Sequence, residues 1–232
     1  GALEKAFHAF CGETVTLHVA GRTDSGVHAV GQVAHVDIER PSTEKEVRDA
    51  VNAHLRPQRI SIVKAEPVSL DFHARYDATK RTYCYKILMT RQASPALLAP
   101  YVWHVGWDLD VEAMHDAARH LLGKHDFTSF RSAACQANSP IRTLDRLDVF
   151  ETKHDFTFGR HVEIWAEARS FLHHQIRNIV GTLKLVGEGK WTPDDVKHVL
   201  EACDRTQAGA MAPASGLYFV KVEYKDKGGG DA

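Results

Sequence analysis

The sequence lacks most of the features that mark the special classes of protein. No apolar stretch approaches the roughly 20 residues of a transmembrane helix. The 4 cysteines form no Cys-x-x-Cys pair, and the 15 histidines include no His-Glu-x-x-His or His-x-His pattern. We therefore expect neither a metal site nor a disulfide framework. The net charge is only -1, which excludes a protein that is basic all over but allows a local patch that binds nucleic acid.

What is present is the composition of an ordinary globular protein. Apolar residues make up 44% and charged residues 25% of the 232 positions. A chain of this length and composition can bury a core that needs no disulfide or metal to stabilise it. The first residues, GALEKAFHAF, place an acid and a base within five positions and are unlike a signal peptide. The scattered cysteines favour free thiols in a reducing compartment, so we expect a cytoplasmic protein without a membrane segment.

Periodicity predicts an α+β fold in two halves. In the first half we expect a helix, two strands, a second helix and a third strand, over residues 2–10, 15–19, 27–37, 43–55 and 60–65. In the second half we expect strands over residues 83–89, 147–149, 162–168 and 218–224, helices over 111–122 and 172–186, a helix that starts at Pro193, and a frayed tail after Lys225. The expected domains are residues 1–72 and 73–232, with helices packed on sheets.

The segment Gly21–Gly26, GRTDSG, is a polar turn between two apolar strands. Asp24 at this bend would point out of the sheet and, being ionised at neutral pH, could act as a nucleophile or base. Arg22 could pair with it or contact a phosphate. The same residues also fit an ordinary Asx-turn, since such turns favour Asp and Gly.

A basic segment with interleaved tyrosines runs from Asp71 to Arg91. Five cations face two acids there, and Tyr83 lies on its predicted strand. Cations beside aromatic rings suit a groove for nucleic acid, because the charges bind phosphates and the rings stack on bases. Composition alone favours the simpler interpretation, a solvated strand with core tyrosines. The cations of this segment are Arg75, Lys80, Arg81, Lys86 and Arg91.

Two further segments contain residues that could serve a site. In FLHHQIRN, residues 171–178, Arg177 lies about 100° around the helix from Ile176 and could reach a carboxylate in a cleft or remain a surface charge. In GKHDFTSFR, residues 123–131, a loop ends at Arg131 and indicates little by itself.

Together these segments resemble the TruA family of tRNA pseudouridine synthases. The matching blocks are GRTDSGVHAVGQVAHVD, DFHARYDATKRTYCYKI, HDFTSFR, FLHHQIRNIVGTL and SGLYFVKVEY, in the family's order and spread over nearly all of residues 1–224. The resemblance implies the pseudouridine synthase fold, with mainly antiparallel sheets and an active-site cleft between the two halves. It also implies a homodimer without a cofactor that isomerises uridines 38 to 40 in the anticodon arm of tRNA.

The resemblance also implies roles for single residues. Asp24 would be the nucleophile, Arg177 its partner, and Tyr83 the ring that stacks on the target uracil and helps to remove its C5 proton. Arg22 would take the place of the flipped base or guide its flipping. Further RNA contacts would come from the basic residues near the site: Arg75, Lys80, Arg81 and Arg131.

Three alternatives remain open at this point. A dimeric aspartic protease also has Asp-Ser-Gly at a strand bend, but Arg22 and Thr23 stand where that site needs apolar residues. A metal hydrolase could use the histidines. A non-catalytic tRNA-binding module is the more serious alternative: family members usually have a strand and a Gly-Trp-Gln-Arg-like segment before the helix that begins here at Ala2, and we expect its loss to leave an open sheet edge.

Overall fold

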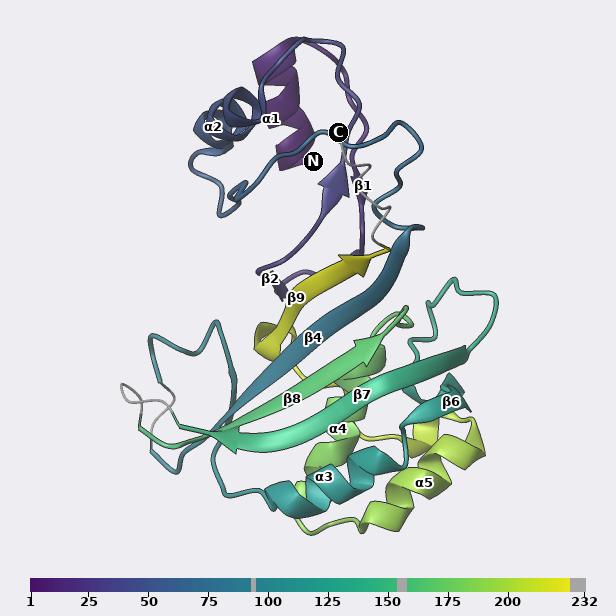
Figure 1. Ribbon diagram of the computed structural model, residues 1–232. Coiled ribbons are helices and arrows are strands. Elements are labelled where there is room, and N and C mark those ends of the chain that lie inside the picture. The colour runs from purple at the N-terminus through teal and green to yellow at the C-terminus, as the bar shows by residue number, and fades with distance from the viewer. Residues whose placement is uncertain (93–94, 154–157, 226–232) are drawn as a thin grey trace. The chain divides into compact units, whose positions relative to one another are not determined.

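A computed structural model describes residues 1–92, 95–153 and 158–225, and the chain's contacts divide them into two compact units (Figure 1). Among the described residues, the first unit holds residues 1–22 and 33–78, and the second holds residues 23–32 and 79–225. The domain boundary expected near residue 72 stays a prediction. The loop that carries Asp24, which we expected in the first half, has its contacts in the second unit.

Five α-helices and nine strands lie in the described residues. The helices are α1 (Ala2–Cys11), α2 (Glu44–Leu55), α3 (Val111–Arg119), α4 (Gln175–Gly187) and α5 (Pro193–Ala202). The strands are β1 (His18–Val19), β2 (His28–Ala29), β3 (Ala34–His35), β4 (Ala78–Met89), β5 (Trp103–Val105), β6 (Gly123–Asp126), β7 (Ile141–Thr152), β8 (Arg160–Ala168) and β9 (Leu217–Tyr224). Three short 3₁₀ turns lie at Thr128–Phe130, Arg205–Gln207 and Ala214–Gly216.

In the first unit, α1 and α2 pack together over a small apolar core that includes Phe7, Phe10 and Val51. The expected capping box starts α2: the amide of Glu46 donates to Oγ1 of Thr43, and the amide of Thr43 donates to the Glu46 carboxylate. β1 and β3 pair antiparallel as a two-stranded sheet.

Two strands expected in the first half are not formed as predicted. The strand over residues 27–37 breaks at Val30 and Gly31, whose amides donate to the carbonyl of Phe219, so β2 and β3 join different sheets. A Cβ at Gly31 would lie 2.0 Å from the carbonyl oxygen of Val220, which explains a glycine at this crossing. The strand over residues 60–65 is absent because the Asn52 side chain, not a neighbouring strand, bonds the amide and carbonyl of Ile62.

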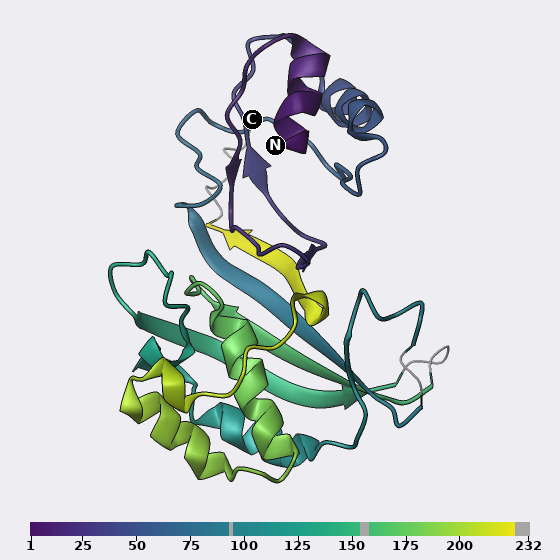
Figure 2. The ribbon, with the colours of Figure 1, turned by 180° about the vertical axis from the view of Figure 1, so that it is seen from behind.

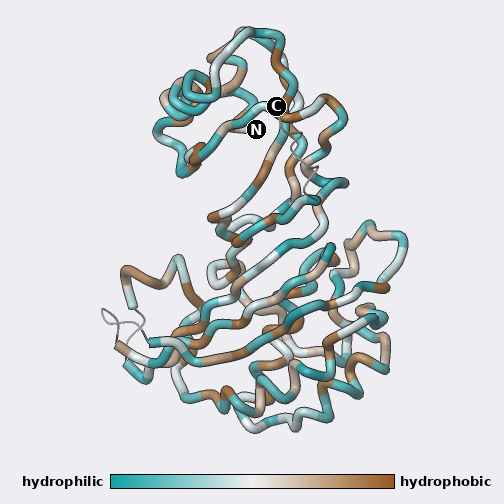
Figure 3. The backbone as a smooth tube through the Cα atoms, viewed as in Figure 1, coloured by the Kyte–Doolittle hydropathy of each residue, from teal (hydrophilic) through white to brown (hydrophobic). Residues whose placement is uncertain are grey.

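The second unit is built on a seven-stranded sheet with the order β2-β9-β4-β8-β7-β6, with β5 paired to β4. β4, β8, β7 and β6 are antiparallel neighbours, whereas β2 pairs parallel to β9 and β5 parallel to β4. The α+β class with mainly antiparallel strands is therefore confirmed. Figure 3 shows hydrophobic segments alternating with hydrophilic ones along these strands.

Helices α3, α4 and α5 pack against one another at one side of this sheet (Figure 2). α4 starts at Gln175 rather than 172, because His174 before it has a left-handed backbone with φ 65°. α3 ends at Arg119, earlier than expected. None of the described helices is long and apolar enough to cross a membrane. The predicted frayed tail after Lys225 falls outside the described residues.

Candidate active site

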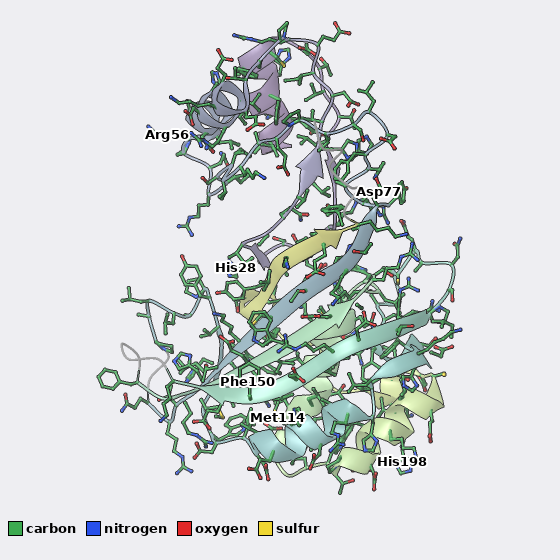
Figure 4. All side chains as sticks on the ribbon, in the orientation of Figure 1. His28, Arg56, Asp77, Met114, Phe150 and His198 are labelled. Atoms are coloured by element: carbon green, nitrogen blue, oxygen red, sulfur yellow. The ribbon has the colours of Figure 1, made fainter. Side chains whose placement is uncertain are left out.

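Asp24 lies at the start of a tight turn that is anchored to the large sheet. The amide of Val27 donates to the Asp24 carbonyl at 3.1 Å, and Gly26 has a φ of 83°, a conformation that favours glycine. After the turn, the ring of His28 in β2 stacks on Tyr218 of β9 with 4.7 Å between centroids (Figure 4 labels His28). These contacts fix the backbone on which the Asp24 carboxylate stands.

Arg177, in the first turn of α4, contacts Asp24 although the two residues lie far apart in the sequence. Its Nη1 donates to Oδ2 of Asp24 at 2.7 Å, and its Nε donates to the carbonyl of Ala212 at 2.8 Å. The amide of Ala212 in turn donates to the Arg177 carbonyl. Arg177 is 9% exposed, so this guanidinium is held in one position and offers a charge-assisted hydrogen bond to the carboxylate.

Two adjacent histidines complete the surroundings of the carboxylate. Nε2 of His173 lies 3.3 Å from Oδ1 of Asp24, and Nε2 of His174 lies 3.2 Å from Oδ2. Burial is the largest cause that lowers the pKa of His174. The charge of Asp24 raises this pKa, whereas the charges of His173 and Arg177 lower it further. The neutral ring is therefore favoured at neutral pH.

Tyr83 of β4 lies in the same unit, close enough to Asp24 for that charge to act on its hydroxyl. Its ring stacks on Phe219 at 4.7 Å and meets Phe171 edge-on at 5.2 Å, and the residue is 8% exposed. Burial raises the pKa of the Tyr83 hydroxyl to about 12; the charge of Arg81 lowers it and the charge of Asp24 raises it. The hydroxyl is thus protonated at neutral pH.

The predicted RNA-binding cations have different surroundings. Lys80 pairs with Glu167 at 3.3 Å, whereas Arg81 is nearly buried and donates from Nη1 to the carbonyl of Arg169. Arg131 follows the short 3₁₀ turn at Thr128–Phe130 and is half-buried.

Arg22 and Arg75 belong to the first unit. Both are exposed, and the Arg75 guanidinium lies 5.8 Å from the ring centre of Tyr76. The second unit therefore brings together the three residues predicted to be catalytic: Asp24, Tyr83 and Arg177.

Two clusters in the described residues have ligand atoms close enough for a metal ion: His18, His35 and His73, and Asp24 with His173 and His174. In the first cluster, Nδ1 of His35 accepts the Ala74 amide, and Nδ1 of His73 accepts the amides of Arg75 and Tyr76. The lone pairs at Nδ1 are thus engaged, and Nε2 carries the proton of each neutral ring.

In the second cluster, the guanidinium of Arg177 already donates a hydrogen bond to Oδ2 of Asp24. A cation bound beside that fixed positive charge would be repelled. Both clusters therefore favour hydrogen bonding over metal binding.

The sequence analysis assigned no role to His173 and His174. The signal that could have identified them is spacing: they precede Arg177 by four and three residues, positions that share one face of a helical turn. Because the helix begins only at Gln175, their contact with Asp24 depends on the left-handed turn at His174, which periodicity does not reveal.

Comparison with known proteins decides the family of this chain. The family described as tRNA pseudouridine synthase matches residues 2–77 and 117–225. The chain belongs to the tRNA pseudouridine synthase family. The resemblance seen in the sequence, and with it the prediction of an isomerase that modifies tRNA, is confirmed.

Similar proteins named tRNA pseudouridine synthase A come from several bacteria. The one from Paramagnetospirillum magneticum is 55% identical over 99% of this chain and 87% of its own length. Those from Rhodospirillum centenum and Sinorhizobium fredii are 53% and 54% identical, over 96% and 97% of this chain and 88% and 89% of their own lengths. Because these relatives are named as synthases, the non-catalytic alternative is not favoured.

Proposed function

We propose that this chain converts uridine to pseudouridine at positions 38 to 40 of the tRNA anticodon arm, with Asp24 as the nucleophile. The single observation that carries the assignment of the site is the pair formed by Asp24 and Arg177 at 2.7 Å, on a turn and a helix that are both fixed by backbone contacts. The family supplies the substrate class and the reaction type.

The reaction needs little beyond a well-placed carboxylate. The N1–C1′ bond of uridine breaks, the uracil turns, a bond forms between C5 and C1′, and the C5 proton is lost while N1 gains one. No other atom enters or leaves, so the proposal requires no cofactor. Asp24 would attack the base or the ribose, or support a glycal intermediate, and positioning within the site would supply much of the rate.

We assign Tyr83 to contact with the extruded uracil. Flipping a base costs a few kcal/mol, and stacking on an aromatic ring recovers about 1–3 kcal/mol of that. Since the pKa of the hydroxyl is raised to about 12, Tyr83 does not act as a phenolate in the free protein. Its hydroxyl would donate a hydrogen bond rather than take the C5 proton unaided.

The predicted RNA-binding cations would contact the RNA backbone. We propose Lys80, Arg131 and Arg75 as phosphate contacts, and Arg22 as the residue that occupies the space of the flipped base. Arg81 is nearly buried and bonded to the Arg169 carbonyl, so we assign it to support of β4 next to Tyr83 and to the electrostatic field of the site.

We further propose that the protein acts as a homodimer in the cytoplasm. The family resemblance supports the dimer, which would widen the surface open to tRNA. The four free cysteines, Cys11, Cys84, Cys135 and Cys203, support a reducing compartment. Analytical ultracentrifugation at micromolar concentration tests the dimer, and a monomer at all concentrations would contradict it.

The position of the modification tests the proposed function. An unmodified tRNA transcript with uridines at positions 38 to 40 is incubated with the full chain, and pseudouridine is mapped by carbodiimide labelling and primer extension. Labelling confined to these positions is the expected result. A transcript with cytidines there is the matched control; labelling at other uridines of that transcript would contradict the assignment.

A further inference from the structure

The left-handed backbone of His174 at the start of α4 is not required for the helix to begin there. His174 precedes the first residue of α4 with φ 65° and ψ 4°, in the left-handed region that is strained for a residue other than glycine. Its side chain makes no capping hydrogen bond. Residues that cap helices, or glycine, would fit this position better. Such strain persists where it serves another purpose.

The imidazole of His174 is directed instead at the Asp24 carboxylate. Its Nε2 lies 3.2 Å from Oδ2, the oxygen that also accepts Nη1 of Arg177, and its side chain is 22% exposed. Among the described residues, the side chain that lies against the other oxygen, Oδ1, is the ring of His173, which is 43% exposed. The two oxygens thus differ. Oδ2 accepts a hydrogen bond from the buried Arg177 and lies against the mostly buried ring of His174, whereas Oδ1 faces the more exposed ring of His173.

We propose that His174 is a positioning residue, which with Arg177 fixes Oδ2 of Asp24 so that Oδ1 is the oxygen that reacts. His173 covers Oδ1 until the nucleotide displaces it. This inference rests on the proposed function of Asp24. No bond to His174 is made or broken in the reaction, and the left-handed backbone is the feature that brings its ring to the carboxylate.

The charge state of His174 suits this role. The groups that face it are the carboxylate of Asp24, the ring of His173 and the guanidinium groups of Arg177 and Arg205, and burial is the largest cause of its lowered pKa. A neutral ring 3.2 Å from Oδ2 adds a polar contact without adding a second full positive charge beside Arg177. The carboxylate therefore keeps more of its nucleophilic character than it would between two cations.

The variant His174→Gly tests the proposal, because glycine removes the ring and relieves the left-handed backbone. We expect kcat on tRNA to fall about 10- to 100-fold with KM within about threefold, as for a misplaced reacting group. The melting temperature should not fall. Added imidazole should restore part of kcat, since the half-open space left by the ring can take it. Unchanged kcat, or a loss seen only in KM or melting temperature, would overturn the proposal.

Cys203→Gly is the matched control. Cys203, with φ 48° after α5, is the other described non-glycine residue with positive φ. Glycine there relieves the same kind of strain away from Asp24, and kcat should remain at the wild-type value with and without imidazole. A kcat loss in this variant that imidazole also restores would show that the rescue is not specific to His174.

A second measurement separates this proposal from the proposed function. The ring protons of His174, assigned by their loss in His174→Gly, are titrated by NMR in wild type and Asp24→Asn. Because the charge of Asp24 raises the pKa of His174, the substitution should lower it. An unchanged titration would overturn the contact even in an active enzyme, whereas a lowered pKa in a chain that modifies no tRNA would overturn only the proposed function.

Discussion

Nη1 of Arg177 and Oδ2 of Asp24 lie 2.7 Å apart although 153 residues of sequence separate them. Each member of the pair is fixed by its own element: Asp24 by the turn before β2, and Arg177 by the double contact with Ala212. Because neither side chain must be ordered when substrate arrives, the site is preorganised, which is how a protein lowers a barrier by orientation.

The first prediction concerns the geometry of this pair. Arg177→Lys keeps a positive charge but loses the fork that contacts both Asp24 and Ala212. We expect kcat to fall about 10- to 100-fold and stability to fall by about 1–3 kcal/mol. Steady-state kinetics and urea unfolding measure the two effects. Arg119→Lys, at the exposed end residue of α3, should change neither. Wild-type activity in Arg177→Lys would refute the role of the fork.

The second prediction separates the ring of Tyr83 from its hydroxyl. Tyr83→Phe retains the stack on Phe219, so the rate constant for tRNA modification should stay within about threefold of wild type. Tyr83→Leu removes the ring and should lose about 1–3 kcal/mol of transition-state stabilisation. Single-turnover kinetics measures both. If Phe and Leu are equally inactive, the hydroxyl rather than the ring face is essential.

Sequence patterns predicted much of this candidate site. Asp24, Tyr83 and Arg177 each stand in a distinct motif, and alternation or helical periodicity places the last two on β4 and α4. The break of the expected strand at Gly31 was missed because it depends on pairing with β9, nearly 190 residues later. The contact of His173 and His174 with Asp24 was missed because one left-handed residue creates it.

A third prediction tests the close packing behind Arg177. A Cβ at Gly181 of α4 would lie 1.8 Å from the carbonyl oxygen of Ala210. Gly181→Ala should therefore displace the segment that holds Arg177 and destabilise the fold by at least about 1–3 kcal/mol. Differential scanning calorimetry measures the loss. Gly106→Ala, where nothing lies within 4 Å of the added Cβ, is the control; equal effects of the two would contradict this packing.

The fourth prediction concerns pH and the first unit. Burial is the largest cause that lowers the pKa of His35; the charges of His73 and His18 also lower it, and Asp37 and Asp77 oppose them. The folded state thus binds a proton less readily than the unfolded state, so the contribution of His35 is full above about pH 6.5 and is lost as pH falls below it. Protonation would also oppose the Ala74 amide that donates to Nδ1.

Hydrogen exchange of the Ala74 amide reports this loss directly. After correction for the intrinsic rate, protection should decrease between pH 7 and pH 5 in the wild type. In His35→Gln, whose side-chain oxygen still accepts the amide, the decrease should be smaller. His198→Gln, exposed on α5 (labelled in Figure 4), should behave as wild type. A pH-independent protection factor in the wild type would contradict the role of His35.

The central claim is that the Asp24 carboxylate drives the exchange of the N1–C1′ bond for a C5–C1′ bond. Tritium release from tRNA labelled at uridine C5 follows the lost proton, and the comparison is between wild type and Asp24→Asn, with tRNA binding measured in parallel. We predict release by the wild type and a decrease on the order of 10³-fold or more in the variant, with tRNA still bound. Comparable release by both would contradict the account.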